Sequence, residues 1–219
     1  MIDAYDWAGG REGMLRLGPD DAPVVIVALP PFEEANRTRT FAVTTMRALA
    51  ERGVASALPD LPGTNDSLIA TEDATLAAWR TAFAAAAEAT GAVTSVAIRG
   101  GALIDTEAAL AGHWHLAPQT SAMLVRELTR IHDAGGGNSD ETVIEIAGNR
   151  LSRHLLGELG AAIVSRDRVR TVRLTNDAQP ADVKIDGSPL WRRAEPDNDP
   201  ALAALLADDI VAWVRTCAG

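Results

Sequence analysis

The chain has 219 residues, a formal net charge of −10 and one cysteine, Cys217. This length suits one domain with a full hydrophobic core. The acidic balance disfavours nucleic acid as a partner, and a single cysteine excludes an intrachain disulfide or a thiolate zinc cluster. We find no run of ~20 apolar residues for a membrane span and no basic, apolar start typical of a signal peptide, so we expect a cytoplasmic protein.

Apolar runs alternate with helical patterns through the first half of the chain. Gly9-Gly10, between two short apolar stretches, predicts an N-terminal antiparallel hairpin. Strands are predicted at residues 24–29, 54–58 and 93–98, and helices at about 37–52 (with Asn36 as N-cap), 71–90 and 101–110. Such alternation with short loops predicts a mostly parallel sheet covered by helices on both faces.

The pattern changes after residue 116. A helix at 121–132, a short strand at 142–147 and a helix at 151–159 are predicted before strands return at 169–174 and about 183–185. Asp199-Pro200 then opens a last helix as N-cap and first helical residue. We therefore expect a single α/β domain, residues 1–219, that carries a small cap-like insertion at 118–165.

The order of elements and the D-x-x-G-x-x-D-S string at residues 60–67 resemble the α/β-hydrolase fold. Four further strings are similar to bacterial hydrolase-like proteins associated with the exosortase A system, which are found near exopolysaccharide and protein-sorting genes. They are P-P-F-E-E-A-N-R-T-R at 30–39, I-R-G-G-A-L at 98–103, E-I-A-G-N-R-L-S at 145–152 and P-L-W at 189–191.

The resemblance implies positions for a Ser-His-Asp triad, and this sequence departs from it at two of them. The nucleophile elbow, G-x-S-x-G in that fold, falls on Ala97–Gly101, where Arg99 takes the place of the serine and Gly100-Gly101 keep the small residues. The loop after the last strand, about 186–199, contains no histidine. Asp177 is a weak candidate for the acid, since an aspartate after a strand is more often a turn residue. Standard serine-hydrolase chemistry is therefore not expected.

The loop after the first parallel strand supplies the oxyanion hole in that fold. We expect Glu33 or Glu34 to contact Arg99 from this loop; the alternative is that a glutamate only favours the helix N-terminus electrostatically. The remaining pocket candidates are polar residues that could read an anionic or hydroxylated ligand, together with aromatic residues near strand ends: Phe32, Asn36, Arg37, Trp114 and Trp191. For both tryptophans, packing in the core is the competing interpretation.

His113-Trp114-His115 places two imidazoles on one face of a strand, a spacing that some metal sites use. No third ligand lies nearby in sequence, so ordinary hydrogen-bonded histidines are favoured and no metal site is predicted. A P-loop, a G-x-G-x-x-G motif and an H-E-x-x-H motif are all missing, and we expect no cofactor.

Three functions fit these observations. The first is a ligand-binding or accessory protein that lacks the triad and is linked, through the resemblance, to exopolysaccharide and exosortase physiology. The second is a hydrolase of non-standard mechanism acting on an ester or similar small substrate. The third is an interaction module that works as an oligomer, for example a homodimer.

Overall fold

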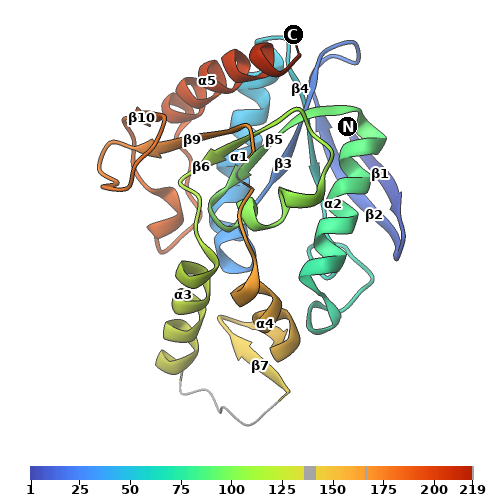
Figure 1. Cartoon of the computed structure of the whole chain (residues 1–219), viewed down its shortest axis with the longest axis vertical. Coiled ribbons are helices and arrows are strands. Elements are labelled where there is room, and N and C mark those ends of the chain that lie inside the picture. Colours follow the sequence, from blue (N-terminus) through green and yellow to red (C-terminus); the bar gives the residue numbers. More distant parts are fainter. Residues whose placement is uncertain (136–141, 166, 219) are drawn as a thin grey trace.

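A mixed eight-stranded sheet organises the chain in the computed structural model, which describes residues 1–135, 142–165 and 167–218 (Figure 1). The strand order is β1-β2-β4-β3-β5-β6-β9-β10. β1 and β2 form the antiparallel hairpin, and β2 pairs antiparallel with β4. In the rest of the sheet, β4-β3-β5-β6-β9-β10, neighbouring strands are parallel. The strands are β1 (Ile2–Trp7), β2 (Gly10–Leu17), β3 (Val24–Ala28), β4 (Ala55–Pro59), β5 (Ala92–Ile98), β6 (Gly112–Leu116), β9 (Val169–Leu174) and β10 (Val183–Ile185).

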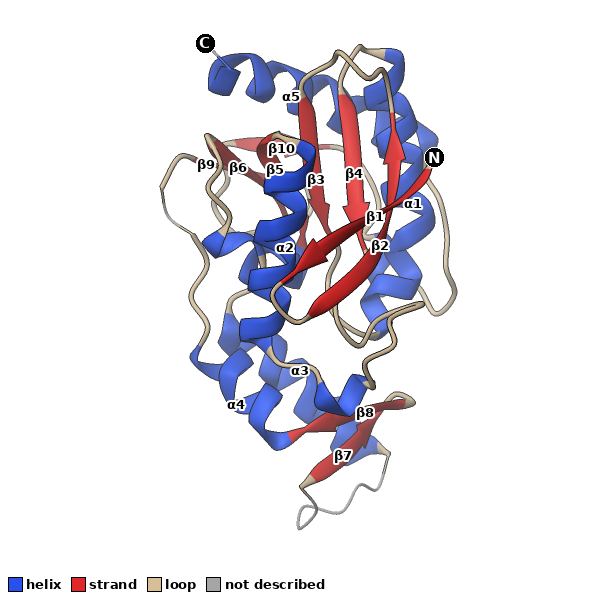
Figure 2. Cartoon of the chain, turned by 90° about the vertical axis from the view of Figure 1, so that its right-hand side faces the viewer, coloured by secondary structure: helices blue, strands red, loops and turns tan. Residues whose placement is uncertain are grey.

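Helices cover both faces of this sheet. α1 (Glu33–Glu51) and α5 (Pro200–Ala218) pack on one face, and α2 (Leu76–Thr90) lies on the other, as Figure 2 shows. Side chains of β3 alternate between the two cores: Val25 and Val27 face α1 and α5, whereas Val24 and Ile26 face α2. β3, β4 and β6 are buried along their whole length. This burial explains the continuous apolar or small-residue sequences of β3 and β4, whereas β6 buries two histidines.

A compact group of elements connects β6 to β9. It consists of α3 (Ser121–Ala134), β7 (Val143–Ile146), β8 (Asn149–Ser152) and α4 (Arg153–Ala161), with β7 and β8 paired as a separate antiparallel ribbon. In Figure 2 the arrows of β3 and β4 point toward this group. Its apolar side chains join the core on the α2 face, among them Leu124, Leu151 and Leu155.

Three predicted helices differ from the structure. The helix predicted at 71–90 begins only at Leu76, with Thr75 as its N-cap, and Thr71–Asp73 form the separate 3-10 segment η1. Residues 101–110 form two short 3-10 segments, η2 (Arg99–Leu103) and η3 (Asp105–Glu107), in place of one α-helix. The carbonyl of Leu103 accepts from Arg80 of α2 at 3.0 Å, and the Asp105 side chain turns into the core. Both contacts draw the chain away from regular helical hydrogen bonding.

α1 begins at Glu33, four residues before the predicted start, and Asn36 is not its N-cap. Phe32 precedes the helix with φ 61° and gives it no side-chain cap. The acidic Glu33 and Glu34 occupy the first turn, where the helix dipole favours negative charge. Among the residues described, no helix combines the length and apolarity needed to cross a membrane.

Candidate functional site

The turn after β5 has the geometry of a nucleophile elbow, with an arginine at its apex. Arg99 adopts the left-handed conformation, φ 55°, which costs a residue with a Cβ roughly 1–2 kcal/mol. A Cβ on Gly101 would lie 2.3 Å from the carbonyl oxygen of Ala28 in β3, and one on Gly100 would lie 2.8 Å from Pro31 Cδ. The two glycines therefore allow the turn to pass directly against β3 and the loop that follows it.

Side chains from three separate segments surround the Arg99 guanidinium. Arg99 donates from Nε and Nη2 to Glu34 Oε1 at 3.3 and 3.1 Å. Glu127 of α3 places its Oε2 3.7 Å from Nη2, and the ring of Trp191 lies 5.1 Å from the guanidinium carbon, within reach of a cation–π interaction. Of the two candidate glutamates, Glu34 thus makes the contact with Arg99, and only 11% of the Arg99 side chain and 13% of the Glu34 side chain are exposed.

The buried environment of Glu34 changes the pKa of its carboxyl group. Burial raises the pKa of the Glu34 carboxyl above its usual value, although the Arg99 ion pair opposes that rise. Glu34 Oε2 is buried without a hydrogen-bond partner in the described part of the chain, and so is Gln119 Oε1. The other end of the Gln119 amide donates to Glu127 at 2.9 Å. One arginine therefore faces two carboxylates, in a group whose hydrogen-bonding capacity is not saturated.

The other predicted residues of the oxyanion loop lie close to this cluster. Glu33 pairs with Arg37 along α1 at 3.4 Å, and Arg37 also donates to the carbonyl of Trp191 at 3.4 Å. Phe32 packs against Trp79 with ring centroids 5.7 Å apart. Asn36 is exposed at the mouth of a neighbouring cavity.

This cavity, which we call the loop cavity, has a volume of about 160 Å³ and lies beyond the ends of β3 and β4. Phe32, Trp79 and Phe83 form an aromatic wall. Polar side chains complete the lining, namely Asn36, Arg39, Thr64, Asn65, Thr71 and Asn149. Asn149 comes from β8, so the connection between β6 and β9 contributes to the cavity.

Two predicted site residues lie elsewhere. Trp114 points to the opposite face of the sheet, where it is 1% exposed and its indole donates to Asp209 of α5 at 2.7 Å. Neighbouring side chains in a strand alternate between faces, so the orientation that buries His113 and His115 on the α2 side places Trp114 on the α5 side. Asp177 binds Arg173 at 2.7 Å, and no hydrogen bond or ion pair among the described residues joins it to Arg99.

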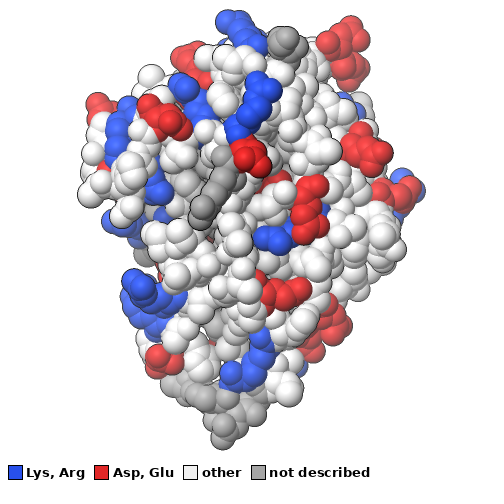
Figure 3. All heavy atoms as spheres, in the orientation of Figure 1, with Lys and Arg blue, Asp and Glu red and all other residues white. Residues whose placement is uncertain are grey.

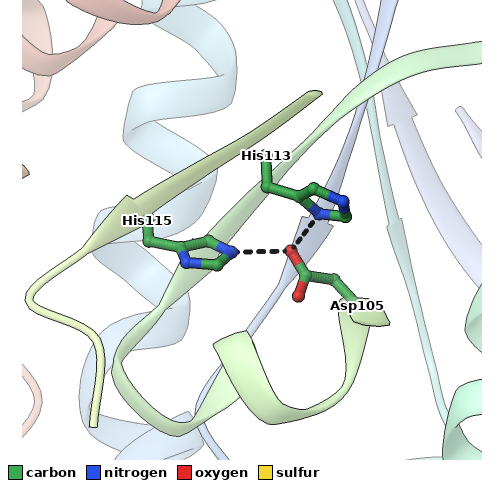
Figure 4. A group of neighbouring side chains, drawn as sticks. All are labelled: Asp105, His113 and His115. Carbon is green, nitrogen blue, oxygen red and sulfur yellow. Dashed lines mark hydrogen bonds and ion pairs between the residues drawn. The ribbon is translucent and has the colours of Figure 1, made fainter. Parts of the chain in front are cut away.

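A second polar cluster lies within the sheet (Figure 4). Asp105 Oδ2 lies 3.0 Å from His113 Nδ1 and 2.9 Å from His115 Nε2, and it accepts from Ser95 Oγ at 2.5 Å. Burial by itself would raise the pKa of the Asp105 carboxyl, but hydrogen bonds with the two imidazoles outweigh burial and hold that pKa at about 2. Asp105 is therefore an ionised carboxylate inside the core.

Sequence reasoning missed four residues of these clusters: Asp105 and Ser95 beside the histidines, and Glu127 and Gln119 near Arg99. Asp105 was not recognised as a core residue because residues 101–110 were assigned to a helix, whose surface commonly carries an aspartate. The apolar pair before it, Leu103-Ile104, was the sequence feature that could have indicated its burial. Glu127 lies on an amphipathic helix among other charged residues, and its sequence gave no sign that it would reach Arg99.

Charge is mixed over the molecular surface. On the face shown in Figure 3, acidic and basic side chains are interspersed, without one continuous basic area. Several arginines are paired with carboxylates: Arg170 with Asp209 at 2.6 Å and Arg52 with Asp208 at 2.7 Å.

Comparison with solved structures supports the fold. Est1E from Butyrivibrio proteoclasticus, solved with bound ferulic acid, has a TM-score of 0.66 at 15% identity, covering 98% of this chain and 99% of the other. The α/β-hydrolase domain-containing protein 10 from mouse has a TM-score of 0.65 at 13% identity, covering 99% of both chains. No protein-family model and no curated protein sequence matches this chain. The chain thus has the α/β-hydrolase fold, while identities this low are informative about fold alone.

Proposed function

We propose that this protein binds a small anionic or hydroxylated ligand on an α/β-hydrolase scaffold that lacks the Ser-His-Asp triad. The observation that carries the proposal is Arg99 at the apex of the elbow. A guanidinium stays protonated at neutral pH and does not act as a nucleophile. Trp191, in the loop where the fold places its histidine, stacks on that guanidinium.

The loop cavity supports the nature of the ligand. An aromatic wall offers a surface for a ring, and the amides and the Arg39 guanidinium offer hydrogen bonds to hydroxyl or carboxylate groups. Arg39 donates from Nη1 and Nη2 to Asp60 Oδ1 at 3.5 and 3.4 Å, long hydrogen bonds that an incoming anion can replace. Pockets of this composition, apolar with a few polar groups, are typical of small-molecule sites.

The physiological setting comes from the sequence resemblance. The strings at 30–39 and 98–103 support a role alongside exosortase and exopolysaccharide functions, in the cytoplasm. We further propose that residues 118–165 act as a cap, because Asn149 lines the loop cavity and Glu127 reaches the elbow.

A turnover test separates binding from hydrolysis. The purified chain is incubated with a fluorophosphonate probe and with a panel of short-chain esters. We expect neither labelling nor hydrolysis above the buffer rate. Labelling that disappears when one particular serine is replaced would refute the absence of a serine nucleophile.

A binding test addresses the cavity itself. Ferulic acid, which the Butyrivibrio esterase holds, and glucuronic acid, a hydroxylated sugar acid, are titrated while the melting temperature is followed. We expect at least one of them to raise it. Ala35→Phe, at the cavity lining, should abolish the shift, whereas Ala50→Phe on the same helix, away from that lining, should retain it. A shift that survives in Ala35→Phe would place the ligand elsewhere, and no shift with either acid would count against this ligand class.

The second candidate is a hydrolase that activates water through a carboxylate. Glu34 favours it, because its pKa is raised and its Oε2 has no hydrogen-bond partner within the described residues; a general base works best with a pKa near the operating pH. Ester hydrolysis that Glu34→Gln abolishes, without fluorophosphonate labelling, would establish this mechanism in place of simple binding.

A further inference from the structure

We propose that Asp105, His113 and His115 bind one divalent transition-metal ion of the zinc class, in a closed structural site inside the sheet. The site is separate from the Arg99 cluster and from the loop cavity. It would join η3, which carries Asp105, to β6, which carries both histidines (Figure 4).

The donor set has suitable chemistry and spacing. One ligand atom of each residue, two imidazole nitrogens and a carboxylate oxygen, lies within 4.8 Å of the others. Such a set suits zinc and neighbouring first-row divalent ions. With metal–ligand bonds of about 2.0–2.2 Å, the oxygen–nitrogen separations of 2.9 and 3.0 Å correspond to angles of roughly 90° at the ion. The side chains are therefore already gathered at ligating distance.

Charge also favours an ion at this point. Asp105 and His115 are fully buried, so the Asp105 carboxyl group lies away from water. Its hydrogen-bonding partners are the two histidines and Ser95, and no lysine or arginine of the described residues forms an ion pair with it. A buried carboxylate requires a compensating positive charge, which a divalent ion supplies while both imidazoles stay neutral.

Hydrogen bonding alone leaves the carboxylate unevenly satisfied. Three polar atoms lie within 3.0 Å of Asp105 Oδ2, whereas Oδ1, equally buried, has no partner in the described part of the chain. A buried carboxylate oxygen without a partner is costly. Coordination offers Oδ1 a role, and it leaves Ser95 Oγ as a hydrogen-bond donor to the bound carboxylate or as a further oxygen ligand.

The position suits a structural ion with a route of entry. The His113 side chain retains 9% exposure, so one edge of the site reaches the surface while the rest is enclosed. His113 and His115 stand on a central strand flanked by β5 and β9, which holds them rigidly. Structural zinc sites are closed by four protein ligands, whereas catalytic sites have three and an open position. Ser95 Oγ, 2.5 Å from Asp105 Oδ2 and 3.0 Å from His113 Nδ1, is the donor placed to close this site as the fourth ligand.

The test uses the full untagged chain, freed of metal with a chelator and then equilibrated with ZnCl2. After removal of unbound zinc, we expect one zinc per chain by mass spectrometry of the metal. His113→Asn and His115→Gln preserve a hydrogen-bonding group near Nδ1 and Nε2 respectively but are poor zinc ligands, and each should weaken zinc binding at least tenfold. His154→Gln is the matched control, because His154 is 72% exposed on α4, and it should bind zinc as the wild type does.

A second measurement does not depend on the variants folding. X-ray absorption at the zinc edge of the wild type should show light-atom ligands with the scattering pattern of two imidazoles. The proposal is overturned if the wild type retains no zinc, if His113→Asn and His115→Gln retain as much as the wild type, or if the absorption spectrum lacks imidazole scattering. In each case the trio is a hydrogen-bonded structural cluster.

Discussion

Replacing Arg99 tests the cluster at the elbow most directly. Arg99→Ala removes the guanidinium that neutralises Glu34 and stacks on Trp191. Arg99→Gly removes the same group and also relieves the left-handed backbone, since φ is 55° at this residue and glycine adopts that conformation without a Cβ penalty.

The expected cost follows from burial. Because the Arg99 and Glu34 side chains are only 11% and 13% exposed, solvent screens their attraction weakly. Removing one partner of such a pair costs about 3–5 kcal/mol, largely because the other charge stays buried; a lost cation–π contact is worth about 0.5–2 kcal/mol within that range. Arg99→Gly should be about 1 kcal/mol more stable than Arg99→Ala, since relief of the left-handed conformation exceeds the added entropy of the unfolded chain.

Urea unfolding of the wild type, Arg99→Ala, Arg99→Gly, Glu34→Gln and the double variant Arg99→Ala/Glu34→Gln measures these terms. The double variant should recover part of the loss, with a coupling free energy of about 0.5–3 kcal/mol. If the free energy of unfolding of Arg99→Ala lies within about 1 kcal/mol of the wild-type value, the ion pair does not stabilise the fold, and the cost inferred from its burial is wrong. Equal stability of the alanine and glycine variants would show that the left-handed backbone at residue 99 carries no strain.

Three further predictions concern other parts of the fold. Gly101→Ala should lower the unfolding free energy by about 1–3 kcal/mol or more, because its Cβ would meet backbone at 2.3 Å; the control Gly157→Ala, whose Cβ meets nothing within 4 Å in α4, should be neutral or stabilising in the same urea assay. Burial raises the folded-state pKa of Glu34 above 4.5, so the contribution of Glu34 to the free energy of unfolding is complete below pH 4.5 and is lost as pH rises through the folded pKa. The melting temperature of the wild type should therefore fall with rising pH relative to that of Glu34→Gln. Melting temperatures that change in parallel with pH would contradict this prediction. Asp209→Asn weakens the acceptor of both the Trp114 indole and the Arg170 guanidinium. It should cost about 1.5–3 kcal/mol by urea unfolding, and an unchanged midpoint would mean that neither hydrogen bond stabilises the fold.

The local elements of the fold were largely predictable from sequence. Buried strands such as β3 are short apolar runs, and Asp199-Pro200 opens α5, where Asp199 caps the amide of Leu202 at 2.9 Å. The segment after the elbow was not predictable in the same way. Its 3-10 turns arise because Arg80, distant in sequence, donates a hydrogen bond to the carbonyl of Leu103, and because the Asp105 side chain is buried in the core.

The sequence by itself determined that an arginine followed by two glycines stands directly after a buried strand, because a close approach of backbone to backbone requires glycine. Only the tertiary structure decided which groups meet that arginine. Glu34, Glu127 and Trp191 approach Arg99 from three segments. In the same way Asp105 contacts His113 and His115 from residues 101–110, which the sequence pattern assigned to a helix. Such meetings depend on strand order and on the packing of distant elements, which a linear pattern of residues does not encode.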